Sequence, residues 1–309
     1  MADNSNCFSK WGVIYCPNPS RRTKRRWKKI LQTLQTSGQP FDFVQSEGEG
    51  SAARLAAMMT QNGYRTIIVV GGDAALNEAI NGIMHAESPT GEHPTLGVIP
   101  NGYANDFAHY WGYIPDEITA TITRLQRGIK RRIDVGVVAE GASKQKHHYF
   151  LNCLNIGIVA NIIHLKRTTR NFWMSRTLSN LFSALQLVFK RQQFKARFNI
   201  HFENHEGTIT GLCIGSAHSY GQTPSAVPYN GLLDIASISQ APLTKTINGL
   251  WLLFMGRFLS YNKVKFWRAQ SIEILDTNNA PISLDGRIHR TEATRLSVGI
   301  LHEEIEFLV

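Results

Sequence analysis

The sequence predicts a two-domain fold, in which an α/β domain with a parallel sheet is followed by a mostly antiparallel, β-rich domain. Over the first third of the chain, apolar strand-like runs alternate with helical patterns, which is typical of βαβ units. From about residue 132, short strand-like runs instead follow one another with turns between them. The 309 residues, 43% of them hydrophobic, are enough to bury two cores of ordinary size.

The first domain is expected to alternate strands and helices. Its strand-like runs are short and apolar, whereas Leu76, Ile80 and Ile83 recur at helical spacing. Strands that are separated by helices of this length pair in parallel. The expected strands are residues 11–16, 41–44, 67–70 and 96–100, and the expected helices are residues 21–34, 52–59 and 73–83.

The second domain is expected to consist of strands joined by turns. Two helical segments, residues 161–191 and 243–259, interrupt it. This change of pattern places the first domain at residues 1–131 and the second at residues 132–292. The expected strands of the second domain are residues 133–138, 149–155, 194–200, 207–214, 232–238, 271–275 and 296–300.

Two strands of the first domain end in glycine turns that carry an aspartate. The first turn is Gly71-Gly72-Asp73, and the second runs from Gly102 to Asn105-Asp106. Glycine lets the backbone approach a ligand closely, and the start of the following helix suits a phosphate. Alone, each has a simpler interpretation, a tight turn or a helix N-cap. Together, at the carboxyl edge of one sheet, they indicate a phosphate-binding site.

These turns resemble the catalytic domain of the diacylglycerol kinase and sphingosine kinase superfamily, of the bacterial soluble type. The resemblance continues to the C-terminus and implies a fold like that of NAD kinase and diacylglycerol kinase, in which residues 293–309 return to the first domain. It also implies transfer of phosphate from ATP, with Mg²⁺, to a lipid hydroxyl between the domains. The matching segments are Asn18-Pro19, Gly71-Gly72-Asp73, Asn77-Glu78, Asn81-Gly82, Pro100 to Ala108, Ile133 to Gly136, Pro224 to Asp234 and Leu284-Asp285-Gly286.

The resemblance also assigns site residues. Either Asp73 or Asp285 is the general base, and the sequence leaves both open. The implied catalytic residues are Asp73, Asp106 and Asp285; the implied nucleotide-binding residues are Asn18, Ser46, Gly71, Gly72, Asn77, Glu78, Gly102 and Asn105; and a second, structural Mg²⁺ would be bound by Asp234 and Asn230.

Departures from the family pattern leave a catalytically impaired nucleotide- or lipid-binding pseudokinase as the alternative. NAD kinase, which shares the Gly-Gly-Asp turn, is disfavoured by the Asn105 to Ala108 turn and by the loop that ends at Asp234. Arg21 and Arg22 are interpreted as substitute phosphate contacts. Retention of all three central aspartates favours an active kinase. The departures are Arg21-Arg22, Ala74-Ala75, Tyr103, Asn230 and Arg287.

The net charge of +10 indicates an anionic partner. Residues 21–29 carry seven positive charges, and residues 166–176 mix cations with aromatic residues, which is typical of a segment at an anionic membrane. We find no nucleic-acid motif, signal peptide or membrane-spanning run, and the histidines show no ligand spacing. The four cysteines form no paired motif. We therefore expect a cytoplasmic protein bound peripherally to membranes, with a homodimer left open.

Overall fold

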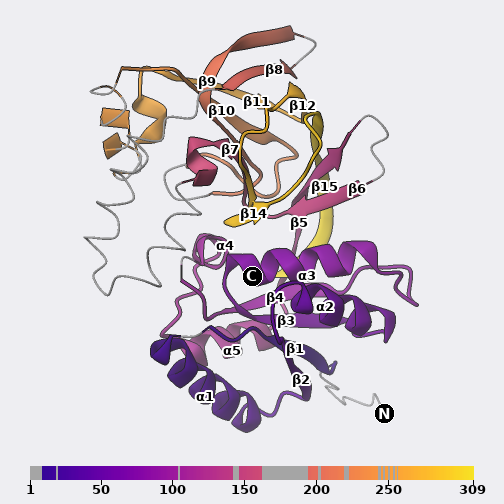
Figure 1. Ribbon diagram of the computed structural model, residues 1–309. Coiled ribbons are helices and arrows are strands. Elements are labelled where there is room, and N and C mark those ends of the chain that lie inside the picture. Colours follow the sequence, from indigo (N-terminus) through magenta and orange to yellow (C-terminus); the bar gives the residue numbers. More distant parts are fainter. Residues whose placement is uncertain are drawn as a thin grey trace. The chain divides into compact units, whose positions relative to one another are not determined.

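The computed structural model of the chain forms two compact units (Figure 1). Unit 1 contains Met1–Ile133 and Glu303–Val309, and unit 2 contains Asp134–His302. The structure describes residues 9–18, 20–103, 105–141, 146–161, 194–200, 203–218, 223–242, 245, 248–249, 251–252, 255 and 257–309.

Unit 1 is a parallel sheet covered by helices, which confirms the predicted α/β fold. The strand order is β2-β1-β3-β4, and the end of β15 joins β4 where Phe307 pairs with Leu96 in parallel. Its strands are β1 (Trp11–Tyr15), β2 (Phe41–Gln45), β3 (Thr66–Gly71), β4 (Thr95–Pro100) and the end of β15 (Leu296–Leu308). Its helices are α1 (Arg21–Thr36), α2 (Ser51–Gln61), α3 (Asp73–His85), α4 (Asp106–Tyr110) and α5 (Ile118–Gln126).

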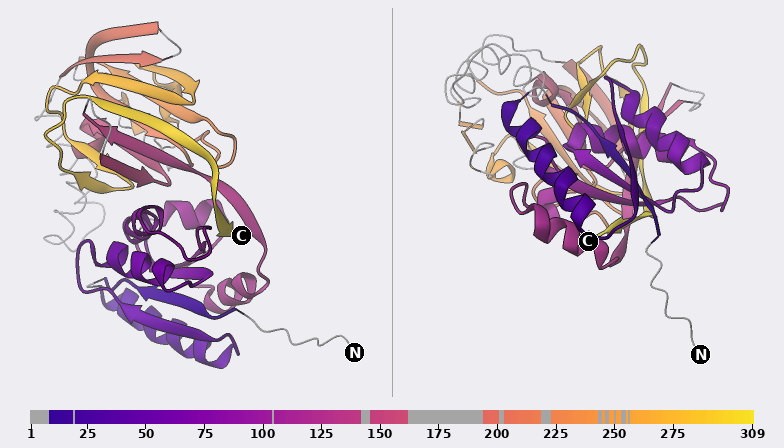
Figure 2. Two further views of the ribbon diagram at one scale, coloured as in Figure 1. Left: turned by 90° about the vertical axis from the view of Figure 1, so that its right-hand side faces the viewer. Right: turned by 90° about the horizontal axis from the view of Figure 1, so that it is seen from below.

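The helices of unit 1 cover both faces of the sheet. Helices α1 and α5 pack together on one face, and α2 and α3 pack together on the other (Figures 1 and 2). Every residue of β3 and of β4 is buried as a result. This explains why these strands read as continuous apolar runs rather than as alternating ones.

Unit 2 is built from antiparallel strands, as predicted for the second domain. One path through its sheet runs β14-β13-β7-β9-β8-β12-β15, β10 pairs with β9 and β11, and β5 pairs with β15 and β6. The elements are β5 (Lys130–Glu140), β6 (Lys146–Phe150), β7 (Cys153–Gly157), β8 (Phe194–Ile200), β9 (Glu203–Gly215), β10 (Leu233–Ser239), the 3-10 helix η1 (Phe258–Ser260), β11 (Val264–Ala269), β12 (Ser271–Asp276), β13 (Ile282–Leu284) and β14 (Arg287–His289).

Some predicted elements of unit 2 differ from the structure. The strand expected at residues 149–155 is divided into the ends of β6 and β7, because Leu151 and Asn152 turn their N–H groups toward the Asp285 carboxylate. The short strands β11, β13 and β14 were not predicted. Most of the helix expected at residues 161–191, and the basic segment 166–176, lie outside the described residues. The helix expected at residues 243–259 is described only in part.

A large apolar core and a smaller second cluster stabilise unit 2. Strands far apart in sequence contribute to the large core, among them Phe150 on β6, Leu212 on β9 and Val298 on β15. The described helices of the chain include none that is long and apolar enough to cross a bilayer.

Candidate active site

The two glycine turns of unit 1 touch each other, backbone to backbone. Strands β3 and β4 are neighbours with Gly71 opposite Pro100, and the Asn101 N–H donates to the Gly71 carbonyl at 2.8 Å. A Cβ added to Gly102 would lie 2.3 Å from the Cα of Gly72, and one added to Gly72 would lie 2.9 Å from the Cα of Gly102. Both positions therefore require glycine for packing, whether or not a ligand is bound.

Asp73 connects the first turn to the second. Its carboxylate accepts the N–H groups of Asp106 and Phe107, each at 3.0 Å, and so caps the first turn of α4. Asn105 adopts a left-handed backbone, with φ of 54°, and its Oδ1 accepts the Gly102 N–H at 2.9 Å. The structure thus brings together Asp73, Gly102, Asn105 and Asp106 at the carboxyl edge of the sheet, as predicted.

Residues of the first loop approach the same edge from α1. Asn18 Oδ1 accepts the Ser20 N–H at 3.1 Å and so shapes the turn that leads into α1. Asn101, which the sequence analysis did not select, is fully buried, and its Nδ2 donates to the Thr23 carbonyl at 3.3 Å. Its position between Pro100 and Gly102, inside the second glycine turn, is the sequence feature that could have identified it. Asn101 ties the second glycine turn to α1.

Cys16 and Ser46, which follow the ends of β1 and β2, form a hydrogen bond through their side chains. Burial raises the pKa of the Cys16 thiol to about 11, although a hydrogen bond with Ser46 lowers it, and the nearby Glu78 charge raises it further. Glu78 Oε2 accepts the Ala52 N–H at 3.0 Å, at the start of α2. Through this contact Glu78 caps the start of α2, and its role as a nucleotide contact stays a prediction. Ser46 stays a prediction as a nucleotide contact.

The Asn77 to Gly82 segment packs α3 against α2. A Cβ on Gly82 would lie 2.1 Å from the Ala53 carbonyl oxygen, so only glycine allows this approach. Asn77 is buried, and its carbonyl accepts a hydrogen bond from Asn81 Nδ2 at 2.8 Å. This part of the motif therefore has a structural explanation.

Asp285 lies in unit 2, in the two-residue turn between β13 and β14. Asp285 and Gly286 both have positive φ, 44° and 80°, which is the geometry of a tight hairpin. The buried carboxylate accepts the N–H groups of Leu151, Asn152 and Cys153 at 2.8 to 2.9 Å. These three hydrogen bonds hold the Asp285 carboxylate in a structural position.

The residues around Asp234 do not fit a divalent cation. Asp234 is buried, its Oδ1 accepts a hydrogen bond from Arg268 Nε at 2.8 Å, and its Oδ2 is hydrogen-bonded to Ser225. Asn230 Oδ1 accepts the Leu232 N–H at 3.0 Å. An arginine side chain therefore supplies the positive charge at Asp234. The prediction of Mg²⁺ at Asp234 and Asn230 has no support in this donor set.

Three departures from the family pattern have clear positions. Arg22 donates to Asp116 Oδ2 at 2.7 Å, beside Arg26, and its phosphate contact stays a prediction. Ala75 packs against Gly71, where an added Cβ would lie 2.7 Å from the Ala75 Cβ. Tyr103 is 50% exposed on the second turn.

Two family models match the chain. Residues 10–138 match the model described as "Diacylglycerol kinase catalytic domain". Residues 155–299 match the model described as "YegS C-terminal NAD kinase beta sandwich-like domain". The two matches follow each other in the order of the two units.

Curated relatives and solved structures agree with these matches. The diacylglycerol kinase of Staphylococcus carnosus is 23% identical over 89% of this chain and 87% of its own length. That of Bacillus subtilis is 22% identical over 89% of this chain and 88% of its own. A candidate diacylglycerol kinase from Bacillus anthracis has a similar fold, with a TM-score of 0.75 at 20% identity over 98% of this chain and 97% of that one. The structure of yeast NADH kinase matches with a TM-score of 0.54, at 10% identity over 97% of this chain and 79% of that one.

Proposed function

Because this chain belongs to the superfamily of the diacylglycerol kinase catalytic domain, we propose that it is a lipid kinase that transfers the γ-phosphate of ATP to the hydroxyl of a lipid alcohol. The observation that carries the proposal is the junction of the two glycine turns, with Asp73 and Asp106 beside it. Nucleotide binding is assigned to unit 1, residues 1–133 with 303–309, and acceptor binding to unit 2, residues 134–302. Diacylglycerol, a sphingoid base and ceramide are the acceptors to test.

The proposed roles follow from exposure and hydrogen bonding. The turns at Gly72 and Gly102, with the positive end of α3, hold the phosphates of ATP. Asp73 and Asp106 are the carboxylates that would hold Mg²⁺, which would accompany ATP and neutralise phosphate charge. Asp73 is half-buried, whereas Asp285 is buried under three backbone N–H groups. We therefore assign the general base to Asp73 and a positioning role to Asp285.

The test is transfer of labelled γ-phosphate from ATP, with Mg²⁺, to a panel of lipid alcohols in mixed micelles. Asp42→Asn is the matched control for the Asp73→Asn variant. Asp42 is also a carboxylate of unit 1, but it lies near the start of β2, where it pairs with Lys10 at 2.7 Å. We expect one lipid class to be phosphorylated by the native chain and by Asp42→Asn. The absence of transfer to every lipid would contradict the proposal.

A pseudokinase on the same scaffold is the second candidate. Asp73 and Asp285 each accept backbone hydrogen bonds that a pseudokinase would also use, so their retention does not discriminate between the two candidates. Tight binding of ATP in a calorimeter without transfer would identify this candidate. The double variant Ala74→Gly, Ala75→Thr then discriminates further, because restored transfer would show that the substitutions had impaired the site.

A membrane surface is the proposed location of the acceptor. Helix α1 buries Thr23, Arg26, Ile30 and Leu34 and leaves a row of cations exposed on its other side. Such a row is attracted to anionic headgroups. The exposed cations are Arg21, Arg22, Lys24, Arg25, Lys28 and Lys29. We propose that the protein is cytoplasmic and binds an anionic membrane through this helix.

A further inference from the structure

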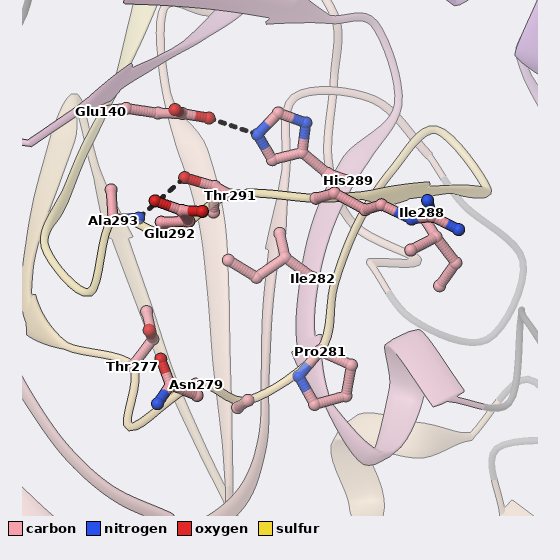
Figure 3. A pocket seen from close by; sticks show the side chains of 12 residues that line it. Glu140, Thr277, Asn279, Pro281, Ile282, Ile288, His289, Thr291, Glu292 and Ala293 are labelled. Atoms are coloured by element: carbon pink, nitrogen blue, oxygen red, sulfur yellow. Dashed lines mark hydrogen bonds and ion pairs between the residues drawn. The ribbon is translucent and has the colours of Figure 1, made fainter.

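Two histidines and a glutamate, none of which has a role in the proposed function, converge in unit 2. His289 Nε2 lies 2.5 Å from Glu140 Oε1, and His148 Nε2 lies 3.4 Å from the same oxygen. One ligand atom from each residue lies within 4.8 Å of the other two. The two imidazole rings are 4.4 Å apart between centroids and inclined at 67°. Figure 3 shows Glu140 and His289 directed at each other.

Paired strands hold this cluster. In the β5–β6 pair, His148 lies opposite Val138, two residues from Glu140, so both side chains extend from the same face. His289 is the last residue of β14 and pairs with Ile282. Ligands that extend from hydrogen-bonded strands need little rearrangement to bind an ion. In sequence the three residues are far apart, so ligand spacing gave no signal and the histidines were assigned no role.

We propose that Glu140, His148 and His289 form a binding site for a divalent transition-metal ion of the zinc class. Two imidazole nitrogens and one carboxylate oxygen are the ligand set of many zinc sites that keep a fourth position open. Ligands bonded to zinc at about 2.0 to 2.2 Å are separated by roughly 3.4 Å in a tetrahedron, which matches the distance between His148 and Glu140. His289 Nε2, at 2.5 Å from the same oxygen, is at hydrogen-bond distance, so the His289 and Glu140 side chains must move apart by about 1 Å when the ion binds. Mg²⁺ prefers an all-oxygen shell, so imidazole nitrogens select against it.

A cavity gives an ion access to the cluster. Glu140 and His289 line a cavity of about 680 Å³, together with Thr277, Asn279, Arg290 and Thr291 (Figure 3). The side chains of Glu140 and His289 are 10% and 12% exposed, so the cluster is shielded without being sealed. The fourth coordination position is assigned to water or to a small anion from this cavity. None of these residues has a named role in the proposed function, so the inference does not depend on it.

The test is titration of the metal-free full chain with Zn²⁺ in a calorimeter and with Co²⁺ by visible absorption. We expect one ion per chain and the strong d–d bands of four-coordinate Co²⁺, with no competition from Mg²⁺. His148→Gln and His289→Gln should each weaken binding by at least about tenfold, because each removes a ligand. Glu140→Gln should do the same through loss of the carboxylate charge.

The matched control is His147→Gln. His147 is the exposed neighbour of His148 and extends from the opposite face of β6. It should bind Zn²⁺ like the native chain. Circular dichroism checks the folding of each variant. If one of the two histidine variants does not fold, the other alone is enough for the test. Unchanged affinity in both histidine variants, equal competition by Mg²⁺, or the absence of Zn²⁺ binding would overturn the inference and leave a simple ion pair.

Discussion

At the scale of single residues, Asp73 combines a structural contact with a proposed catalytic role. Its two carboxylate oxygens accept the N–H groups of Asp106 and Phe107. In Asp73→Asn one of these N–H groups would face an amide N–H instead. We expect turnover to fall by about 10² to 10⁴, the usual contribution of a general base. We also expect the free energy of unfolding to fall by about 1 kcal/mol, because a partly buried hydrogen bond is lost.

Turnover is measured by label transfer and the free energy of unfolding by urea denaturation. Both measurements use one preparation, at a temperature where the variant stays folded. Asp42→Asn controls for the loss of a carboxylate. If Asp73→Asn transfers phosphate at the native rate while its stability falls, Asp73 is only a helix cap.

The contact between Gly72 and Gly102 predicts a strong effect of a single methyl group. In Gly102→Ala the new Cβ would lie 2.3 Å from the Gly72 Cα and 2.8 Å from Asn105 Oδ1, so the turns must separate. We expect a loss of about 1 to 3 kcal/mol in the free energy of unfolding, together with weaker ATP binding. Gly48→Ala is the control, because nothing lies within 4 Å of its added Cβ. Equal stability of the two variants in urea would show that the turns are not in contact.

The sequence was sufficient to predict the residues of the glycine turns but not what several polar side chains do. Asp285-Gly286 carries the signal of a tight hairpin, but nothing in the sequence shows that the Asp285 carboxylate accepts three backbone N–H groups. Asp234 was assigned to a metal by the family resemblance, and nothing in the sequence shows that Arg268, 34 residues later, pairs with it. Pairing between distant residues is fixed by strand register, which local patterns do not reveal.

At the scale of elements, the alternation of strands and helices predicted the parallel sheet of unit 1, since helices such as α1 are amphipathic and strands β1, β3 and β4 are buried on both faces. The short strands β13 and β14 escaped prediction because three residues are too few to show a period. The last strand, β15, differs from the other strands named here because its residues belong to both units. Glu303, at the start of the segment that belongs to unit 1, has a left-handed backbone with φ of 50°.

Glu306 fixes the end of β15 to unit 1. The hydrogen bond from Lys130 Nζ, at 2.7 Å, and a second from Thr95 lower the pKa of Glu306 below its ordinary value of 4.5. The ionised Glu306 carboxylate therefore makes its full contribution to stability above pH 4.5. This contribution is lost as the pH falls through the pKa of Glu306 in the folded state. Because both charged side chains are more than a third exposed, we expect less than about 1 kcal/mol.

The predicted consequence is that Glu306→Gln is less stable than the native chain at about pH 7 and equally stable at about pH 3. Urea denaturation at both pH values measures this. Glu92→Gln, a change at an exposed loop glutamate, should differ from the native chain at neither pH. A stability difference for Glu306→Gln that persists at low pH would mean that its charge is not responsible.

At the scale of the whole molecule, the positive charge is the property that the sequence predicted and that a simple binding experiment can test. The chain carries a net charge of +10, and α1 exposes Lys24, Arg25 and Lys28. Each cation near an anionic surface contributes about 1 kcal/mol. Reversal of these three cations to glutamate should therefore weaken binding to vesicles that contain anionic lipid by more than about tenfold, as measured by co-sedimentation at low salt.

The control for this prediction reverses three exposed cations elsewhere, Arg65, Arg127 and Lys265, and so changes the net charge by the same amount. Attraction that depends only on net charge would fall equally in both sets of variants, because the field of the whole molecule acts at a distance. Attraction through α1 would fall mainly in the first set. Label transfer to a soluble short-chain acceptor should be the same for the α1 variant and the native chain, since α1 then affects only access to the membrane. Equal loss of vesicle binding in the two sets would contradict a membrane-binding role of α1 and leave net charge as the cause.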